Sequence, residues 1–117
     1  TMLDDKLNLT TGEYTEWGNP KKKKYFDYML KYSPYENIKL DNKYPNMYIY
    51  GNLEDSRVSY WEPLKYYARI KKSNVFCSNQ KQVHLSINTD FGHSQSSERY
   101  AELRETAIIQ SVIIDHK

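Results

Sequence analysis

The sequence predicts an α/β fold that is built on a parallel sheet. Two segments with the character of strands, residues 47–50 and 83–90, alternate along the chain with segments of helical periodicity. Strands that alternate with helices are typical of a parallel sheet covered on both faces. Because two strands are too few to form such a sheet alone, we expect chain outside these 117 residues to complete it.

The composition is that of one small domain or of part of a larger one. The 17 basic and 15 acidic residues nearly balance, which does not favour nucleic acid or a membrane surface as a partner. There is no apolar run of the roughly 18 residues that a membrane-spanning helix needs, and the N-terminus lacks the pattern of a signal peptide. Cys77 is the only cysteine, which excludes an internal disulfide and fits a reducing compartment. We therefore expect a cytoplasmic protein.

The first predicted helix follows a polar segment. Residues 7–20 are interrupted by Gly, Asn and Pro, which break both periodicities and predict an ordered loop. In residues 25–32 the apolar side chains recur at three- and four-residue spacing, which predicts a helix that ends at Ser33-Pro34. The lysines at 21–24 are expected to precede this helix, because cations at a helix N-terminus oppose its dipole.

The next pair of elements is a strand and a helix. Residues 47–50 form an uninterrupted apolar run that closes on a Gly-Asn pair, as in a strand covered on both faces. Helical periodicity follows in residues 59–72. The start of this helix stays open, because Ser59 and Glu62 have capping-box spacing whereas Pro63 favours the first helical position.

The last pair of elements follows a polar connection at residues 71–82. Apolar and polar residues alternate in the strand at 83–90, and one face of it carries Val83, Leu85 and Ile87. A polar loop with serine cap candidates and Glu98 then leads into a final helix. Its broad apolar face contains Leu103, Ala107, Ile108, Val112 and Ile113.

Polar clusters follow both predicted strands: GNLEDSRV begins at residue 51 and NTDFGHSQ begins at residue 88. Functional residues of an open parallel sheet gather beyond the carboxyl ends of the strands, so Asp55 and His93 would emerge at the same edge. A carboxylate there can accept an imidazole N–H, which leaves the second ring nitrogen free as a base. The residues alone leave two alternatives open: a catalytic pair, or an ordinary loop histidine beside a solvated turn.

Longer motifs resemble one family. GEY-x-EWGNP, YSPY-x-N, D-S-R-V-x-YWEP-x-K and TDFGHSQSSERY are similar to the C-terminal part of the prolyl oligopeptidase family of serine peptidases, and within it to the oligopeptidase B group. The resemblance runs from Thr1 to about Ile114. It implies that residues 1–117 are the C-terminal part of an α/β-hydrolase peptidase domain, incomplete without its upstream part. The nucleophile elbow and the β-propeller domain of the family are absent from these residues.

The resemblance also implies a serine, acid and histidine triad. In it Asp55 is the acid and His93 the general base; the neighbouring Glu54 is not selected, because the family's acid directly precedes the Ser-Arg-Val run. The four glycines offer no G-x-S-x-G elbow, so the serine is expected upstream. Arg57 matches a family arginine that contacts a substrate backbone carbonyl.

Oligopeptidase B-like enzymes cleave after Arg or Lys, which requires a carboxylate in a partly desolvated pocket. Glu13 matches the family position that binds the basic side chain. Family members commonly have a second acid two residues later, where this chain has Thr15. We therefore expect a weaker preference for basic residues; the alternative for Glu13 is a salt bridge within a loop.

The combined prediction is a serine-type endopeptidase that hydrolyses short peptides after Arg or Lys. Its partners would be peptide substrates and the upstream part of the same polypeptide, and this chain alone is expected to be inactive. No cofactor is expected and no metal, because His84 and His116 lack the spacing of metal ligands. Two alternatives stay open: an inactive hydrolase-like interaction module, and a hydrolase that acts on esters or neutral peptides.

Overall fold

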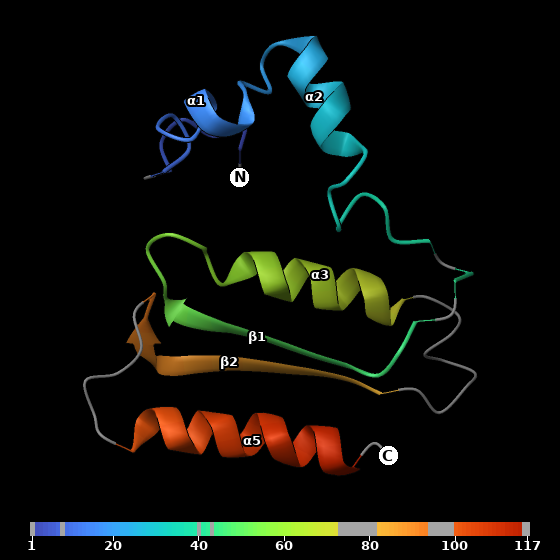
Figure 1. Cartoon of the computed structure of the whole chain (residues 1–117), viewed down its shortest axis with the longest axis vertical. Helices are drawn as coiled ribbons and strands as arrows, with labels where there is room; N and C mark the ends of the chain where they lie inside the picture. Colours follow the sequence, from blue (N-terminus) through green and yellow to red (C-terminus); the bar gives the residue numbers. More distant parts are fainter. Residues whose placement is uncertain are drawn as a thin grey trace. The chain divides into compact units, whose positions relative to one another are not determined.

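The chain folds into two compact units, Thr1–Lys39 and Leu40–Lys117. The second unit contains the two strands and the helices that flank them (Figure 1). The computed structural model describes residues 2–7, 9–39, 41–42, 44–72, 82–93 and 100–115.

The first helix, α1 (Tyr14–Trp17), is a single turn. It lies within residues 7–20, where the sequence predicted only a loop, so that prediction is wrong at this turn. The carbonyl of Glu13 accepts the N–H of Trp17 at 2.9 Å, and the turn ends at Gly18, which has a φ of 91°. Such a short helix has too few residues for a hydrophobic period to show in the sequence.

The second helix is α2 (Lys23–Leu30). It ends close to the predicted stop at Ser33, but Lys23 and Lys24 lie inside its first turn rather than before it, which corrects the prediction. The ammonium of Lys23 donates to the carboxylate of Asp27 at 2.6 Å, one helical turn further on. An exposed pair at this spacing contributes a few tenths of a kcal/mol and offsets part of the unfavourable interaction with the helix dipole.

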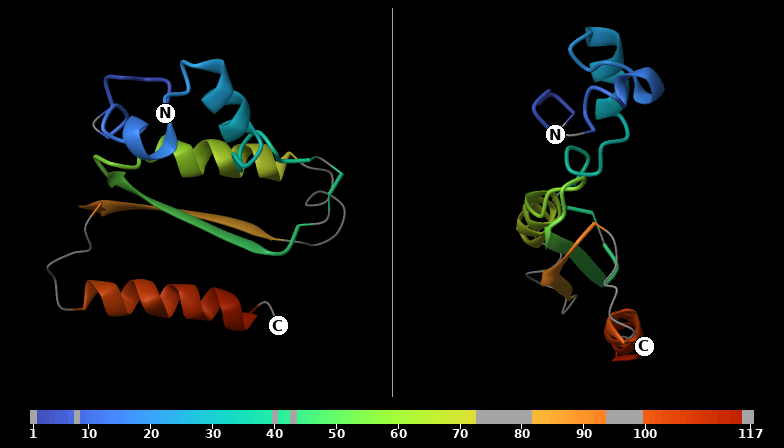
Figure 2. Two further views of the ribbon diagram at one scale, coloured as in Figure 1. Left: turned by 45° about the horizontal axis from the view of Figure 1, so that its top comes forward. Right: turned by 90° about the vertical axis from the view of Figure 1, so that its left-hand side faces the viewer.

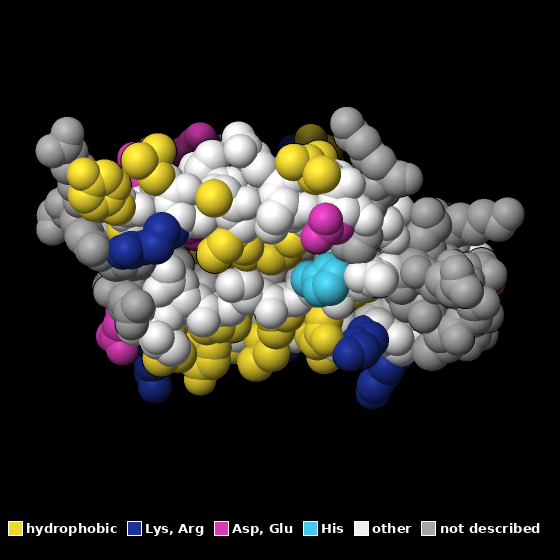
Figure 3. All heavy atoms as spheres, turned by 90° about the horizontal axis from the view of Figure 1, so that it is seen from below, with side chains coloured by type: hydrophobic (Ala, Val, Ile, Leu, Met, Phe, Trp, Pro, Cys, Tyr) yellow, Lys and Arg dark blue, Asp and Glu magenta, His cyan; other side chains and the backbone are white. Residues whose placement is uncertain are grey.

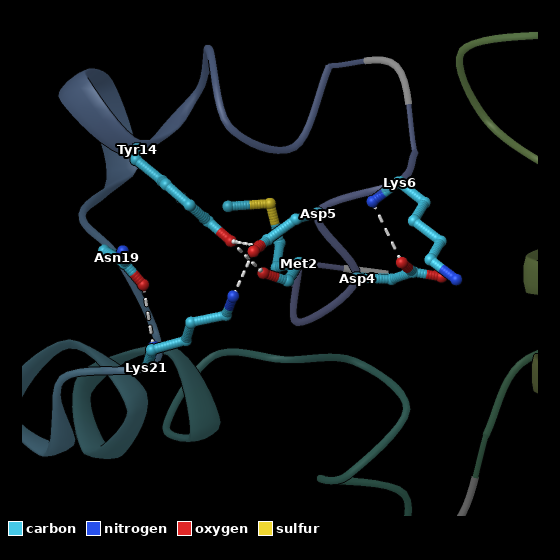
Figure 4. Close-up of polar contacts among 7 residues, drawn as sticks. All are labelled: Met2, Asp4, Asp5, Lys6, Tyr14, Asn19 and Lys21. Atoms are coloured by element: carbon cyan, nitrogen blue, oxygen red, sulfur yellow. Dashed lines mark hydrogen bonds and ion pairs between the residues drawn. The ribbon is translucent and has the colours of Figure 1, made fainter.

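A polar cluster ties the N-terminal segment to α1 (Figure 4). The Tyr14 hydroxyl donates to the Asp5 carboxylate at 2.6 Å, and the ammonium of Lys21 donates to the same carboxylate. The hydrogen bond to Asp5 raises the pKa of Tyr14 to about 12, because ionisation of the phenol would remove that bond. The contact with Lys21 lowers the pKa of Asp5.

The sheet of the second unit consists of β1 (Met47–Glu54) and β2 (Val83–Gly92), which pair in parallel. Met47 lies opposite Val83, and the register stays regular as far as the pair of Asn52 and Asn88. Both strands run beyond their predicted ends. Gly and Asn are poor strand formers, but pairing with a neighbouring strand supplies the hydrogen bonds that their backbone needs. The parallel pairing confirms the predicted α/β class.

Helix α3 (Trp61–Lys71) connects the two strands and packs on both of them. It begins at neither of the predicted starts, since Tyr60 precedes the first helical residue and Pro63 is the third. A proline fits there because the first N–H groups of a helix have no partner within it. Ile70, near the other end, is completely buried.

Helix α5 (Ala101–Asp115) lies on the opposite side of the sheet from α3 (Figures 1 and 2). Most of its predicted apolar face is exposed. Figure 3 views the molecule from the side of α5 and shows hydrophobic side chains spread along this side. Among the described residues the buried hydrophobic side chains are Ile38, Ile70 and Ala101. Tyr50 of β1 is 57% exposed, so the described residues do not cover both faces of this strand as predicted.

Within the described ranges no helix has the length and apolar character to cross a membrane. Cys77, Glu98, His116 and the serine cap candidates at 94–97 lie outside those ranges.

Candidate active site

Asp55 follows directly after β1. Its Oδ1 accepts the backbone N–H groups of Arg57 and Val58, each at 2.8 Å. An aspartate that accepts N–H groups two and three residues further on turns the chain and fixes its own side chain in the same step. The carboxylate is thereby anchored at the end of the strand, and its side chain is only 10% exposed.

His93 follows directly after β2, and the carboxyl ends of the two strands lie at the same end of the sheet (Figure 1). Its Nδ1 lies 3.0 Å from both carboxylate oxygens of Asp55. The His93 side chain contacts the carboxylate and is still 39% exposed, so part of the ring remains accessible to solvent. The structure therefore brings together the two side chains that the sequence placed at one edge.

The electrostatics favour an ionised Asp55. Burial raises the pKa of this carboxyl, but the hydrogen bonds from the N–H groups of Val58 and Arg57, followed by the contact with His93, lower it more, and the resulting pKa is below the ordinary 3.8. An ionised carboxylate accepts the N–H of His93 Nδ1. That bond leaves Nε2 as the nitrogen with a free lone pair, which is the arrangement of a general base.

Two other residues were predicted for the site, Arg57 and Glu13. Arg57 is exposed and lies in the turn that its backbone N–H helps to form with Asp55. Glu13 is half-buried at the start of α1, in the other compact unit. The hydroxyl of Thr15, at the position of the expected second acid, donates to the carbonyl of Gly12 at 3.1 Å. His84 is exposed, with Nε2 2.9 Å from a side-chain oxygen of the nearby Gln82. In the described part of the chain no three His, Cys, Asp or Glu side chains group as metal ligands do.

One contact near the pair was not anticipated. The side-chain Nδ2 of Asn52, in β1, donates to the carbonyl of Gly92 in β2 at 2.8 Å. The sequence predicts that the first strand stops at the pair of Gly51 and Asn52. No local signal could have revealed the contact, because it depends on the register between segments that are 40 residues apart.

Comparisons with known proteins agree on one family. The family model described as "Prolyl oligopeptidase family" matches residues 1–113. Dipeptidyl aminopeptidase BI of Pseudoxanthomonas mexicana is 44% identical over 115 residues, which is 98% of this chain and 15% of that protein. Protease 2 of Moraxella lacunata is 41% identical over 115 residues, which is 98% of this chain and 16% of that protein. The chain thus spans a small part of the length of these relatives.

A solved structure matches as well. The structure of oligopeptidase B from Leishmania major superposes with a TM-score of 0.88 at 39% sequence identity, over 98% of this chain and 15% of that one. The parallel strands and flanking helices are therefore part of an α/β-hydrolase fold, and the chain belongs to the prolyl oligopeptidase family.

Proposed function

We propose that the protein containing this chain is a serine peptidase in which Asp55 and His93 are two members of the catalytic triad. The observation that supports this most strongly is the contact of His93 Nδ1 with both carboxylate oxygens of Asp55, at 3.0 Å. In a triad the carboxylate fixes the tautomer of the imidazole and stabilises the imidazolium that forms. The serine lies in the part of the protein outside residues 1–117, and this chain is the C-terminal part of the peptidase domain.

The proposed reaction follows from these roles. The serine oxygen attacks the carbonyl carbon of the peptide bond while its proton passes to Nε2 of His93, and His93 then gives that proton to the leaving amine. A water molecule then attacks the carbonyl carbon of the acyl group while its proton passes to Nε2 of His93, and His93 returns that proton to the serine oxygen as the acyl group leaves as a carboxylic acid. Asp55 stays ionised throughout. The guanidinium of Arg57 donates to a substrate carbonyl, and the backbone N–H of Arg57, which donates to Asp55 Oδ1, supports this role by fixing the residue beside the pair.

We further propose that Glu13 binds an arginine or lysine side chain of the substrate, so that the enzyme cleaves short peptides after basic residues. The half-buried position of Glu13 is compatible with a partly desolvated ion pair. Because Thr15 stands in place of a second acid, the carboxylate of Glu13 binds the basic side chain alone. A cytoplasmic location fits the single cysteine of the sequence.

A second candidate function is the release of dipeptides from the amino terminus of a peptide. It is favoured by the similarity to a protein named dipeptidyl aminopeptidase BI. Peptides with a blocked amino terminus separate the two candidates, because an endopeptidase cleaves them whereas an aminopeptidase of this kind requires a free amine.

The test is kcat/KM of the full-length protein on blocked and free reporter peptides that carry Arg or Ala before the cleaved bond. Asp55→Asn is expected to lower kcat roughly 10⁴-fold and His93→Ala roughly 10⁶-fold, the order that loss of the acid and of the base of a triad costs. Asp27→Asn and His84→Ala are matched controls and should leave activity unchanged. Undiminished activity in the Asp55 and His93 variants would rule out the triad assignment.

The same assay examines the recognition of basic residues. Glu13→Gln should lower kcat/KM about 10- to 100-fold on the Arg peptide, the order expected for loss of a charge-assisted hydrogen bond, and leave the Ala peptide unaffected. Glu16→Gln, in the same turn, is the control. An unchanged preference for Arg in Glu13→Gln would rule out Glu13 as the residue that recognises the basic side chain. A wild-type protein without any preference for Arg would favour a hydrolase of esters or neutral peptides, and one without hydrolytic activity would favour an interaction module.

A further inference from the structure

We propose that Asn52 is a positioning residue, which holds the backbone of His93 in the orientation that the base requires. This inference rests on the proposed function of His93. Its starting point is the half-buried hydrogen bond from Asn52 Nδ2 to the carbonyl oxygen of Gly92, at 2.8 Å. The residue that provides this oxygen directly precedes His93.

The bond spans the one place where the described pairing of the strands becomes irregular. From Asn52 to Glu54 the first strand advances two residues, whereas the second advances four, from Asn88 to Gly92. Such a bulge bends the strand and re-aims the side chains that follow it. A strand that bulges has lost regular ladder hydrogen bonds on one side, so its end needs another contact to fix its direction. The amide of Asn52 supplies such a contact.

The held carbonyl belongs to the peptide unit that joins Gly92 to His93. Because a peptide unit is planar, fixing its oxygen restricts the orientation of the whole plane, and with it the direction in which the His93 side chain leaves the backbone. The approach is close on this side, since a Cβ atom on Gly92 would lie 3.1 Å from the carbonyl oxygen of Glu54. Glycine therefore allows the second strand to come near enough for the bond.

Asn52 and Asp55 hold the histidine at two points from one short segment. Asp55 contacts the ring through Nδ1 at 3.0 Å, and Asn52 holds the peptide that precedes the residue. With the ring alone held, the imidazole could still pivot about its contact with the carboxylate and displace Nε2. A displacement of about 1 Å in a reacting group can cost on the order of 100-fold in rate, so the second point of attachment matters for the direction of Nε2.

The experiment compares two asparagines that bridge the same two segments. Asn46, just before β1, accepts the N–H of Gln82 through Oδ1 at 3.1 Å, at the opposite end of the sheet from His93. Asn46→Ala is thus a matched control for Asn52→Ala in the full-length protein. We expect Asn52→Ala to lower kcat roughly 5- to 10-fold, the order expected for the loss of one hydrogen bond, with little change in KM. Asn46→Ala should change neither quantity.

A second variant and a second measurement keep the inference testable apart from turnover. Asn52→Gln retains an amide donor and should recover part of kcat. The proton resonance of the Nδ1–H of His93 should persist in wild type and in Asn46→Ala, and broaden or disappear in Asn52→Ala. This resonance can be followed even in a protein that hydrolyses no peptide, so failure of the proposed function would not be mistaken for failure of this inference.

The comparison of Asn52→Ala with Asn46→Ala has one result that supports the inference and two that overturn it. A selective loss of kcat and of the resonance in Asn52→Ala supports the positioning role. If an active protein keeps its kcat and the resonance after the Asn52→Ala change, the inference is wrong. It is equally wrong if both alanine variants lose activity in proportion to a fall in thermal stability, because that result would mean a general contribution to the sheet.

Discussion

At the scale of single residues, Asp55 has two sets of partners with different functions. The backbone N–H groups of Arg57 and Val58 fix the carboxylate in place through Oδ1, and Nδ1 of His93 lies 3.0 Å from both carboxylate oxygens. Both sets favour the ionised form, which is why the pKa is lowered although burial opposes this. An acid that stays ionised over a wide pH range is what a base needs to keep one tautomer.

The lowered pKa predicts how Asp55 contributes to stability as the pH changes. A carboxyl whose pKa is lower in the folded state than its ordinary 3.8 stabilises the fold fully above that value, and the contribution is lost as the pH falls through the folded pKa. The difference in urea midpoint between the full-length protein and its Asp55→Asn variant should therefore be constant from about pH 6 to pH 4.5 and shrink below the ordinary carboxyl value. A difference that has already disappeared at pH 5 would contradict this.

At the scale of elements, the packing of α3 on β1 depends on a glycine. A Cβ atom on Gly51 would lie 2.7 Å from Cγ of Pro63, which is closer than two carbon atoms approach without displacement. The proline ring at the start of α3 thus occupies the space that a side chain at position 51 would need. This contact fixes how near the helix comes to the strand that leads to Asp55.

The close contact predicts the result of substitution at position 51. Gly51→Ala should lower the free energy of unfolding of the full-length protein by about 1–3 kcal/mol, the usual cost of overpacking, as measured by denaturant titration. Pro63→Ala in the same chain should restore part of the loss, because it removes the ring. Gly12→Ala is the control, since its nearest neighbour would be the carbonyl oxygen of Leu9 at 3.6 Å. Equal stability of Gly51→Ala and wild type would show that the proline ring moves aside freely.

At the scale of the whole molecule, this chain exposes much apolar surface. Leu103, Ile113 and Ile114 of α5 are each more than 60% exposed, and Ile70 is the one large side chain among the described residues that is fully buried. The sheet has two strands, so both of its edges lack a neighbouring strand within the described residues. Exposed strand edges and apolar patches of this kind promote association.

The 117-residue polypeptide on its own is therefore expected to associate and to unfold without a sharp transition. Sedimentation and thermal denaturation of the purified polypeptide measure both properties. As a control, the full-length protein should be less prone to association at the same concentration. A monomeric polypeptide with a cooperative unfolding transition would show that its small core is sufficient.

The sequence by itself determined the order of the two strands and of helices α2, α3 and α5, and the edge at which Asp55 and His93 meet. Hydrophobic spacing is a local property, so it revealed residues 47–50 of β1 and 83–90 of β2, and parallel pairing then required the carboxyl ends of the two strands to coincide. The family motifs came from the sequence as well. Where α3 begins was decided by packing, since Ser59 and Pro63 gave conflicting local signals.

Only the tertiary structure decided how the histidine is held. Its contact with Asp55 at 3.0 Å depends on the turn that anchors the carboxylate and on the bulge in β2. The bond from Asn52 to Gly92 depends on the register of two strands whose residues are 40 positions apart. The hydrophobic pattern of each strand limits which of its faces can be buried, but a contact between two particular residues forms only when the two distant segments are brought together in one register.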